Sequence, residues 1–228
     1  MVTNFGDIDL IPVPVRNKAY EVLKRAIIQG TLKPGQRLVE AQIAEMLNIS
    51  RTPLREAILK LEPMGFVQRL PNGGAMVASL SAQEIRELYA VRSMLEGLAA
   101  RESAAGLTDE QLGRLADLTR QLETAGAADV AQIAEIGERF HLIILEASGN
   151  RKCREHLSML RDQIDRYRYL TIVIPGREQA AAREHFTLLA VLRRRDPDQA
   201  EQAMRRHVLQ AGESMMRRLS TMDLGTQA

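Results

Sequence analysis

Three histidines in the C-terminal half of the chain could together bind a metal ion. At 100° per residue, His185 falls on the leucine-rich face of its predicted helix. His207 falls among small residues, which leaves room for a cavity, and His141 lies at the rim of an apolar stripe. Neutral imidazoles commonly bind zinc, nickel and similar divalent ions, so three of them in one bundle indicate a metal site. The alternative is that each is a hydrogen-bonded core residue, as a single inward-facing histidine usually is.

A charged pair falls on the apolar face of another predicted helix. Arg92 and Glu96 lie in the middle of the stripe of residues 82–105, and buried charges are costly unless they are paired. They could form a structural i,i+4 pair, or Arg92 could point into a cavity and bind a carboxylate, for which its planar fork is suited. Arg92 and Glu96, together with Asn150, are the candidate effector-binding residues.

The elements that must position these residues are predicted to be helices. From Ser81 onward the chain is alanine-rich, and breaks at glycine and proline separate its apolar stripes. The expected helices lie near 82–105, 109–124, 129–148, 151–172, 178–195 and 197–220. Such a segment predicts an all-α six-helix bundle.

The N-terminal part predicts a different unit. Helices are expected over 15–29, over 40–47 and from Thr52-Pro53 to Leu61, where Pro63 stops the last one. Two extended segments, 66–70 and 75–79, flank the turn Pro71-Asn72-Gly73-Gly74. This order predicts a winged helix-turn-helix, whose second helix enters the major groove of DNA. That helix carries Arg51, Arg55 and Lys60, although a basic face can also be merely solvated.

The expected fold is therefore mostly α, with two domains. Residues 1–78 form the winged helix-turn-helix domain, including a flexible arm at 1–12, and residues 79–228 form the effector-binding and dimerisation domain. The first domain has 10 basic and 7 acidic residues, a net charge of +3, whereas the second has 21 and 22, a net charge of −1. The junction Ser79-Leu80-Ser81 is short, so we expect the domains to be coupled.

Composition excludes several other classes of protein. The single cysteine, Cys153, excludes a disulfide framework and a cysteine-rich zinc module. No apolar run approaches the ~20 residues of a membrane span, and the N-terminus does not resemble a secretory signal. Aromatic residues make up 4% and tryptophan is missing, which disfavours a base-stacking single-strand binder. We therefore expect a cytoplasmic protein without a membrane partner.

Several motifs resemble those of the GntR family of bacterial transcription regulators. In the first domain they are Gly30-x-Leu32-x-Pro34-Gly35-x-Arg37-Leu38 and Ser50-Arg51-Thr52-Pro53-x-Arg55-Glu56-Ala57. The second domain resembles the FadR-type (FCD) effector domain through FHLIILEASGN at 140–150, Glu184-His185 and Met204-x-x-His207. Its six helices are more similar to the shorter, VanR-like branch than to the acyl-CoA-sensing branch.

The resemblance implies a homodimer on a palindromic, double-stranded operator, and repression as the sign of regulation. The DNA-contacting positions would be Ser50, Arg51, Thr52, Arg55, Arg37, Asn72 and the wing-tip Gly74. Two positions depart from the family pattern: Gly73 stands where a basic residue is common, and Pro63 stands where a helix-friendly residue is usual.

The resemblance also implies a divalent metal held by three histidines and an aspartate four residues before the first of them. Here that position is Gly137. The nearest carboxylate, Glu138, is about 100° further round the helix. The site could be completed by water and ligand, could recruit Glu138, or could be empty.

These observations favour a ligand-responsive regulator that senses a small organic acid. One alternative is an acyl-CoA-type sensor without a metal, and another is a three-histidine metalloenzyme. Against an enzyme, no carboxylate near the histidines stands out as a general base, and the winged domain would be unexplained. We therefore expect no enzymatic activity.

Overall fold

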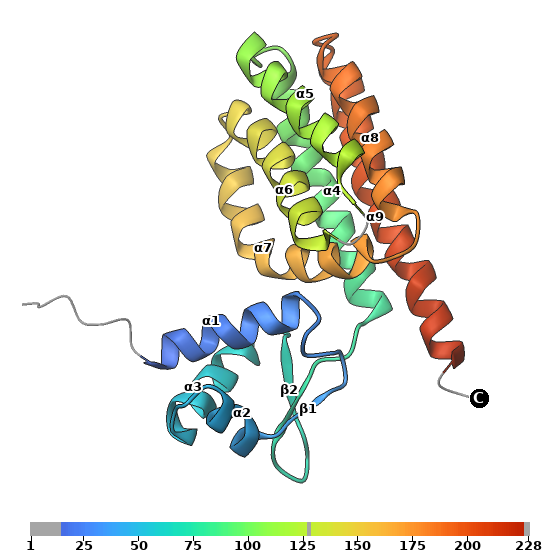
Figure 1. Cartoon of the computed structure of the whole chain (residues 1–228). Coiled ribbons are helices and arrows are strands. Elements are labelled where there is room, and N and C mark those ends of the chain that lie inside the picture. Colours follow the sequence, from blue (N-terminus) through green and yellow to red (C-terminus); the bar gives the residue numbers. More distant parts are fainter. Residues whose placement is uncertain (1–14, 127–128, 226–228) are drawn as a thin grey trace, which may run out of the picture. The chain divides into compact units, whose positions relative to one another are not determined.

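The computed structural model describes residues 15–126 and 129–225, so the predicted arm at 1–12 lies outside the described residues. The chain divides into two compact units, Met1–Ser79 and Leu80–Ala228. The first is a winged helix-turn-helix and the second is all-α (Figure 1), which confirms the predicted fold class. Within the described residues, no helix has the length and apolar character to cross a bilayer.

The N-terminal unit contains a helix-turn-helix and a small antiparallel sheet. In chain order its elements are α1 (Val15–Ile28), β1 (Arg37–Leu38), α2 (Glu40–Met46), α3 (Arg51–Leu61), β2 (Val67–Arg69) and β3 (Ala75–Val77). The strands lie in the order β1-β3-β2, and the buried Leu23, Leu54 and Phe66 belong to the core. As expected, α3 ends just before Pro63.

Strand β1 is the element that the sequence pattern did not predict. It has only two residues, too few to show the alternation that identifies a strand. It forms because β3 offers it a partner: Arg37 pairs with Met76, and the Val77 N–H donates to the Gln36 carbonyl at 2.8 Å. Arg37 is thereby fixed on the wing sheet.

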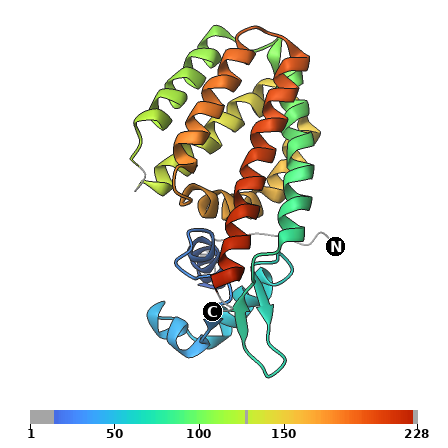
Figure 2. The same ribbon diagram turned by 90° about the vertical axis from the view of Figure 1, so that its right-hand side faces the viewer.

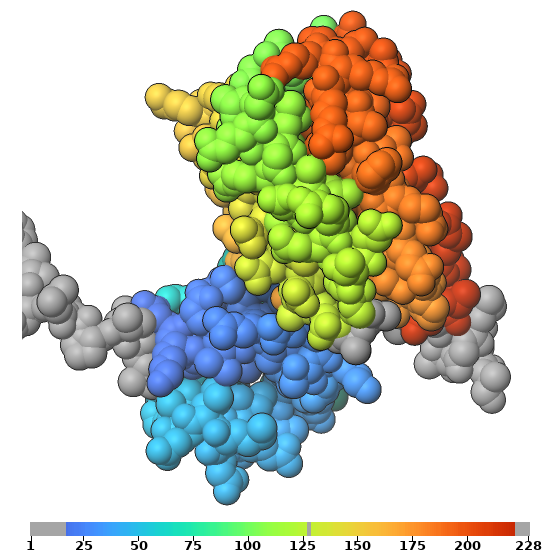
Figure 3. All heavy atoms as spheres, turned by 45° about the horizontal axis from the view of Figure 1, so that its top comes forward, coloured from blue at the N-terminus to red at the C-terminus, as the bar shows by residue number. Residues whose placement is uncertain are grey.

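The C-terminal unit is a bundle whose helices closely follow the predicted ranges. They are α4 (Ala82–Ala104), α5 (Asp109–Thr124), α6 (Val130–Ala147), α7 (Arg151–Ile172), α8 (Arg177–Leu192) and α9 (Pro197–Gly225). Polar side chains fix several starts: Ser81 accepts from the Glu84 N–H, and Thr108 and Gln111 form a capping box. Side chains of α5 and α8 lie together on the face seen in Figure 3.

Helices α4 and α9 pack side by side along much of their length (Figures 1 and 2). Two glycines permit the close approach. A Cβ on Gly212 would lie 2.8 Å from Cγ of Tyr89, and a Cβ on Gly97 would lie 2.5 Å from Cγ of Arg205. This contact brings the buried polar residues of α4 next to the inner face of α9.

Candidate functional site

The three histidines singled out by the sequence converge inside the C-terminal unit. His141 comes from α6, His185 from α8 and His207 from α9. One ring nitrogen from each lies within 4.8 Å of the others, and the Nε2 atoms of His141 and His207 are 3.2 Å apart. His185 and His207 are buried, and His141 is partly buried. The prediction that these side chains share one site agrees with this geometry.

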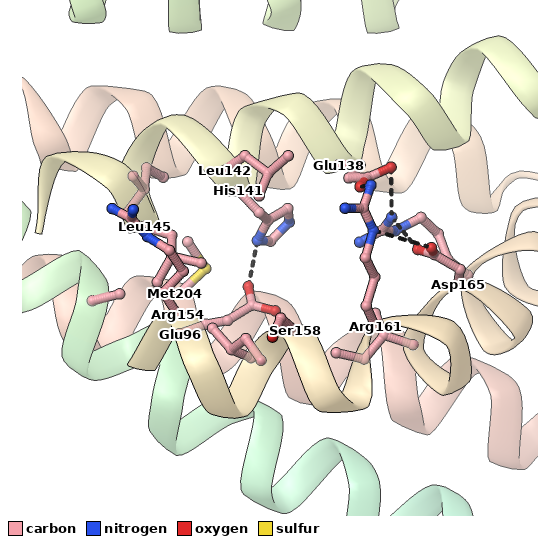
Figure 4. A pocket seen from close by; sticks show the side chains of 15 residues that line it. Glu96, Glu138, His141, Leu142, Leu145, Arg154, Ser158, Arg161, Asp165 and Met204 are labelled. Carbon is pink, nitrogen blue, oxygen red and sulfur yellow. Dashed lines mark hydrogen bonds and ion pairs between the residues drawn. The ribbon is translucent and has the colours of Figure 1, made fainter. Parts of the chain in front are cut away.

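Each imidazole has its Nδ1 against a hydrogen-bond acceptor. In His207 this nitrogen lies 2.8 Å from the Glu184 carboxylate, and in His185 it lies 2.7 Å from the Ala181 carbonyl. In His141 it meets the carboxylate of Glu96 (Figure 4). Since a carboxylate and a carbonyl only accept, each Nδ1 carries the proton and donates it. In a neutral imidazole the Nε2 atom then carries the lone pair, and the Nε2 atoms of His141 and His207 lie 3.2 Å apart.

Two facing lone pairs repel each other unless a proton or a metal ion lies between them. The Nε2 of His185 is buried and has no hydrogen-bond partner among the described residues. Buried polar atoms are nearly always satisfied, so this unpartnered nitrogen beside two other imidazoles fits a ligand position for an ion. Imidazoles oriented by carboxylates and carbonyls through Nδ1 are typical of metal ligands. These residues thus fit a divalent metal with at least one coordination position left for another ligand.

Both carboxylates that orient the histidines are held by buried arginines. Arg92 donates from Nε to Glu96 at 2.5 Å, and Arg177 donates from both Nη atoms to the two oxygens of Glu184 at 3.0 and 2.9 Å. Burial alone would raise the pKa of Glu96, but Arg92 and His141 hold it well below its usual range. Hydrogen bonds from His207 and Arg177 likewise hold the pKa of Glu184 below its usual value against the effect of burial.

A small cavity of about 60 Å³ adjoins the histidines. The side chains that line it include Tyr89, Arg92, Gly137, Arg168, Arg177 and the three histidines. A Cβ on Gly137 would have no heavy atom within 4 Å, so the backbone leaves open space where relatives are expected to carry aspartate. The Nε of Arg177 is buried without a hydrogen-bond partner among the described residues. The cavity thus combines convergent Nε2 atoms, cationic side chains and free volume.

Two residues considered in the sequence analysis lie elsewhere. Glu138 forms an ion pair with Arg161 of α7 and is not among the clustered ligands. Asn150 caps α7 by accepting from the Cys153 N–H, and its amide donates to Glu102 at 2.8 Å. The structure therefore gives Asn150 a capping role, and it lines neither this cavity nor the larger one described below.

Two residues of the site were not singled out from the sequence. Glu184 had appeared only as the neighbour of His185 in a motif, and Arg177 had not been considered. The sequence contained only a weak signal for Glu184. It precedes the inward-facing His185 by one residue, so it lies 100° round the helix and can face a different neighbouring helix. For Arg177 there was none, because residue 177 lies at the start of its helix, where side-chain direction depends on the preceding turn.

The predicted DNA-contacting residues lie in the N-terminal unit and are all exposed. Ser50 is the N-cap of α3, and Arg51 and Thr52 begin its first turn. Arg55 is one turn further on and forms an ion pair with Glu40 of α2 at 2.7 Å. This arrangement presents basic and hydroxyl side chains at the N-terminal end of the second helix of the motif.

The wing tip is a glycine turn beside an arginine. Gly73 and Gly74 have φ values of +82° and +88°, in the region that favours glycine. A Cβ on Gly74 would lie 3.8 Å from Nη2 of Arg37, so the guanidinium lies beside the tip. Asn72 is exposed in the same turn.

The fold and the two sets of residues define a two-domain DNA-binding regulator, and comparison with known proteins gives its family. The profile of the bacterial regulatory proteins of the gntR family matches residues 15–77, and that of the FCD domain matches residues 87–210. The chain belongs to the GntR family of transcription regulators, in the group that carries an FCD domain. It is a regulator and not an enzyme, as expected from the sequence.

Individual relatives agree with this assignment. The chain is 28% identical over 203 residues to the HTH-type transcriptional repressor RspR of Escherichia coli K12, covering 89% of each chain. It is 31% identical to the uncharacterized HTH-type transcriptional regulator YdhC of Bacillus subtilis 168, covering 86% of this chain and 88% of the relative. Among solved structures, E. coli McbR/YncC has a similar fold, with a TM-score of 0.71, 24% identity, and coverage of 91% of this chain and 100% of that one.

The buried histidines predict a pH-dependent stability in the metal-free protein. Burial lowers the pKa of His141 from 6.5 to about 4 and also lowers the pKa of His185. Between these two pKa values the unfolded chain binds a proton at His141 and the folded chain does not. The free energy of unfolding therefore decreases as the pH falls from 6.5 toward 4. Between about pH 7.5 and about pH 5, His141 alone should lower the free energy of unfolding by roughly 2 kcal/mol.

Urea denaturation of chelator-treated protein at fixed protein concentration measures this loss. His141→Gln should reduce the pH dependence, and His156→Gln, at an exposed histidine of α7, is the matched control. An equal pH dependence in native protein and His141→Gln would contradict the prediction.

Proposed function

We propose that this chain represses transcription as a homodimer on a palindromic operator in the cytoplasm, and that a small carboxylate, bound beside a divalent metal, controls operator binding. The convergence of three Nε2 lone pairs beside the open space at Gly137 carries the proposal. Repression is supported by the similarity to RspR, which is named a repressor.

The proposed DNA-binding surface consists of the start of α3 and the wing. Arg51 is exposed on the first turn of α3, and the described residues give it no ion-pair partner, so its fork can bind a guanine edge or a phosphate. Arg55 donates from Nε to Glu40, which orients its guanidinium. Ser50 and Thr52 would contact phosphates or bases, and Arg37, Asn72 and Gly74 would bring the wing to the backbone of the DNA.

The proposed effector site uses the metal and the neighbouring arginines. With zinc or nickel held by three neutral histidines, the ion keeps its full positive charge, because Gly137 supplies no carboxylate. A carboxylate effector would occupy the open coordination position and pair with Arg92 or with the unpartnered Nε of Arg177. Glu138 is engaged by Arg161, so recruiting it would break an ion pair.

The size of the small cavity beside the three histidines favours a small acid over an acyl-CoA as the effector. A volume of about 60 Å³ is far below that of an acyl chain, and an apolar tunnel would not need three oriented imidazoles. Bound effector would draw α4, which carries Arg92, toward α8 and α9. Because the Ser79–Ser81 junction is short, that movement would reach the winged unit. Allosteric coupling free energies are typically ~1–3 kcal/mol.

The proposed dimer interface lies on α4. Val91, Met94 and Leu98 are 50%, 54% and 38% exposed and recur at i, i+3 and i+7, which forms one apolar strip on the outer face of that helix. An exposed strip of this kind marks an interaction surface. A second copy of the chain is the expected occupant, because a single winged module reads only a few base pairs and two half-sites supply the remaining affinity.

Replacing Arg51 should weaken operator binding. Arg51→Ala should cost about 1–3 kcal/mol and relax sequence preference at one position of each half-site. Fluorescence anisotropy with DNA from upstream of the gene, at fixed salt, measures the loss. Arg25→Ala, at an exposed arginine of α1, is the control. If Arg51→Ala binds as tightly as native protein, the docking proposal is wrong.

Restoring a carboxylate at Gly137 should strengthen metal binding and block the effector. Gly137→Asp places the carboxylate one turn before His141, in space that is open. Zinc titration calorimetry should show roughly tenfold or greater tightening, while Gly113→Asp, at an exposed glycine of α5, should change nothing.

The double variant His185→Ala, His207→Ala gives the opposite test. It should lose bound metal and the response of operator binding to a panel of small carboxylates, yet still bind operator. If the native protein binds no metal and the double variant still responds to a carboxylate, the histidines are structural and the proposed effector site is wrong.

A charge on the α4 strip should separate the proposed dimer. Met94→Glu buries a carboxylate in the interface, which is costly without a partner. Sedimentation at micromolar concentration should show a monomer with weakened operator binding. Met159→Glu, at a methionine of α7 that is 68% exposed, should remain dimeric. A Met94→Glu protein that stays dimeric would exclude this face as the interface.

A further inference from the structure

A second and larger cavity lies between α6 and α7, with α4 and α9 contributing to its wall. Its volume is about 260 Å³, and Figure 4 shows it from close by. It shares His141 and Arg168 with the small cavity, so these two side chains separate the two spaces. Neither the proposed metal site nor the proposed carboxylate site uses it.

The middle of this cavity is apolar. The side chains that make it so are Leu142, Leu145, Leu157, Ile164 and Met204. An apolar cavity of about 150 Å³ stays dry and binds benzene. By that scale, the space here suits an apolar body within a ligand of roughly ten non-hydrogen atoms.

The two ends of the cavity differ in charge. At one end, the arginines of α7 are already paired: Arg161 with Glu138, and Arg168 with Asp165 at 2.8 Å. At the other end lies Arg154, near Leu145 in Figure 4. The described residues give Arg154 no carboxylate partner, so its guanidinium is available to an anion. Glu96, also in the wall, is neutralised by Arg92.

We infer that the α6–α7 cavity is a second ligand site, which binds a monocarboxylate of roughly ten non-hydrogen atoms with an apolar body. The chain or ring lies among the leucines, and the carboxylate pairs with Arg154 at the mouth. Because Glu96 and His141 form part of the wall, such a ligand touches the hydrogen bond that orients His141. Ligand binding in this cavity can therefore influence the histidine site, but it does not require a metal or an effector to be bound there.

Octanoate, with ten non-hydrogen atoms, is the probe, and octanamide is its uncharged counterpart. The chain contains no tryptophan, so Ser158→Trp, at an exposed residue of the cavity wall, provides a single fluorescent reporter. Saturable quenching or a blue shift with octanoate, and roughly tenfold weaker binding of octanamide, is the expected result.

Variants in the reporter background locate the site. Arg154→Glu should weaken octanoate binding roughly tenfold or more, while Arg151→Glu, at an exposed arginine of α7 outside the cavity, should leave it unchanged. Ala99→Leu fills part of the cavity and should lower octanoate affinity. Because this substitution changes no charge, it tests the apolar part of the site separately from Arg154. Circular dichroism establishes that each variant is folded.

The metal-site double variant separates this inference from the proposed function. His185→Ala, His207→Ala should still bind octanoate even where metal and small carboxylates are lost. Octanoate binding that requires those histidines, or that survives Arg154→Glu unchanged, would overturn the inference. Absence of saturable octanoate binding, by fluorescence in the reporter protein and by calorimetry in the native protein, would overturn it as well.

Discussion

The interaction on which the C-terminal unit depends is the donation of three Nδ1 protons outward, to Glu96, Glu184 and the Ala181 carbonyl. Once these bonds place the protons on Nδ1, the remaining ring nitrogens of neutral histidines are acceptors that lie close together inside the bundle. A packed protein does not bring lone pairs together without compensation, because each unsatisfied polar atom costs on the order of 1–3 kcal/mol. Everything proposed for the site, from the metal to the acid that completes its coordination, follows from this constraint.

The charges around the histidines are arranged to hold that geometry. Arg92 and Arg177 each clamp one glutamate, and each glutamate orients one histidine. A buried glutamate without its arginine would be desolvated and would tend to take up a proton, which would end its role as acceptor. Gly97 and Gly212 permit the close packing of α4 on α9. This packing brings Arg92 and Glu96, with the histidine that Glu96 orients, beside His207.

In the N-terminal unit the corresponding constraint is to display charge and not to bury it. Short helices and a three-stranded wing enclose a small apolar core, so that Arg51 and Arg37 remain exposed at the start of α3 and at the wing tip. The two units therefore treat arginine oppositely. The N-terminal unit leaves Arg51 and Arg37 exposed, whereas the C-terminal unit buries Arg92 and Arg177 and pairs each with a glutamate.

The sequence by itself determined the fold class, most element bounds and the three histidines, because helical periodicity and glycine or proline breaks are local signals. It also indicated both possible roles of Arg92, and the structure contains its pairing with Glu96. Only the tertiary structure decided that Glu138 faces Arg161, that Asn150 caps a helix, that Glu184 and Arg177 belong to the site, and that a two-residue strand holds Arg37. These depend on which helix or strand is the neighbour, and contacts between residues far apart in the chain leave no periodic trace in it.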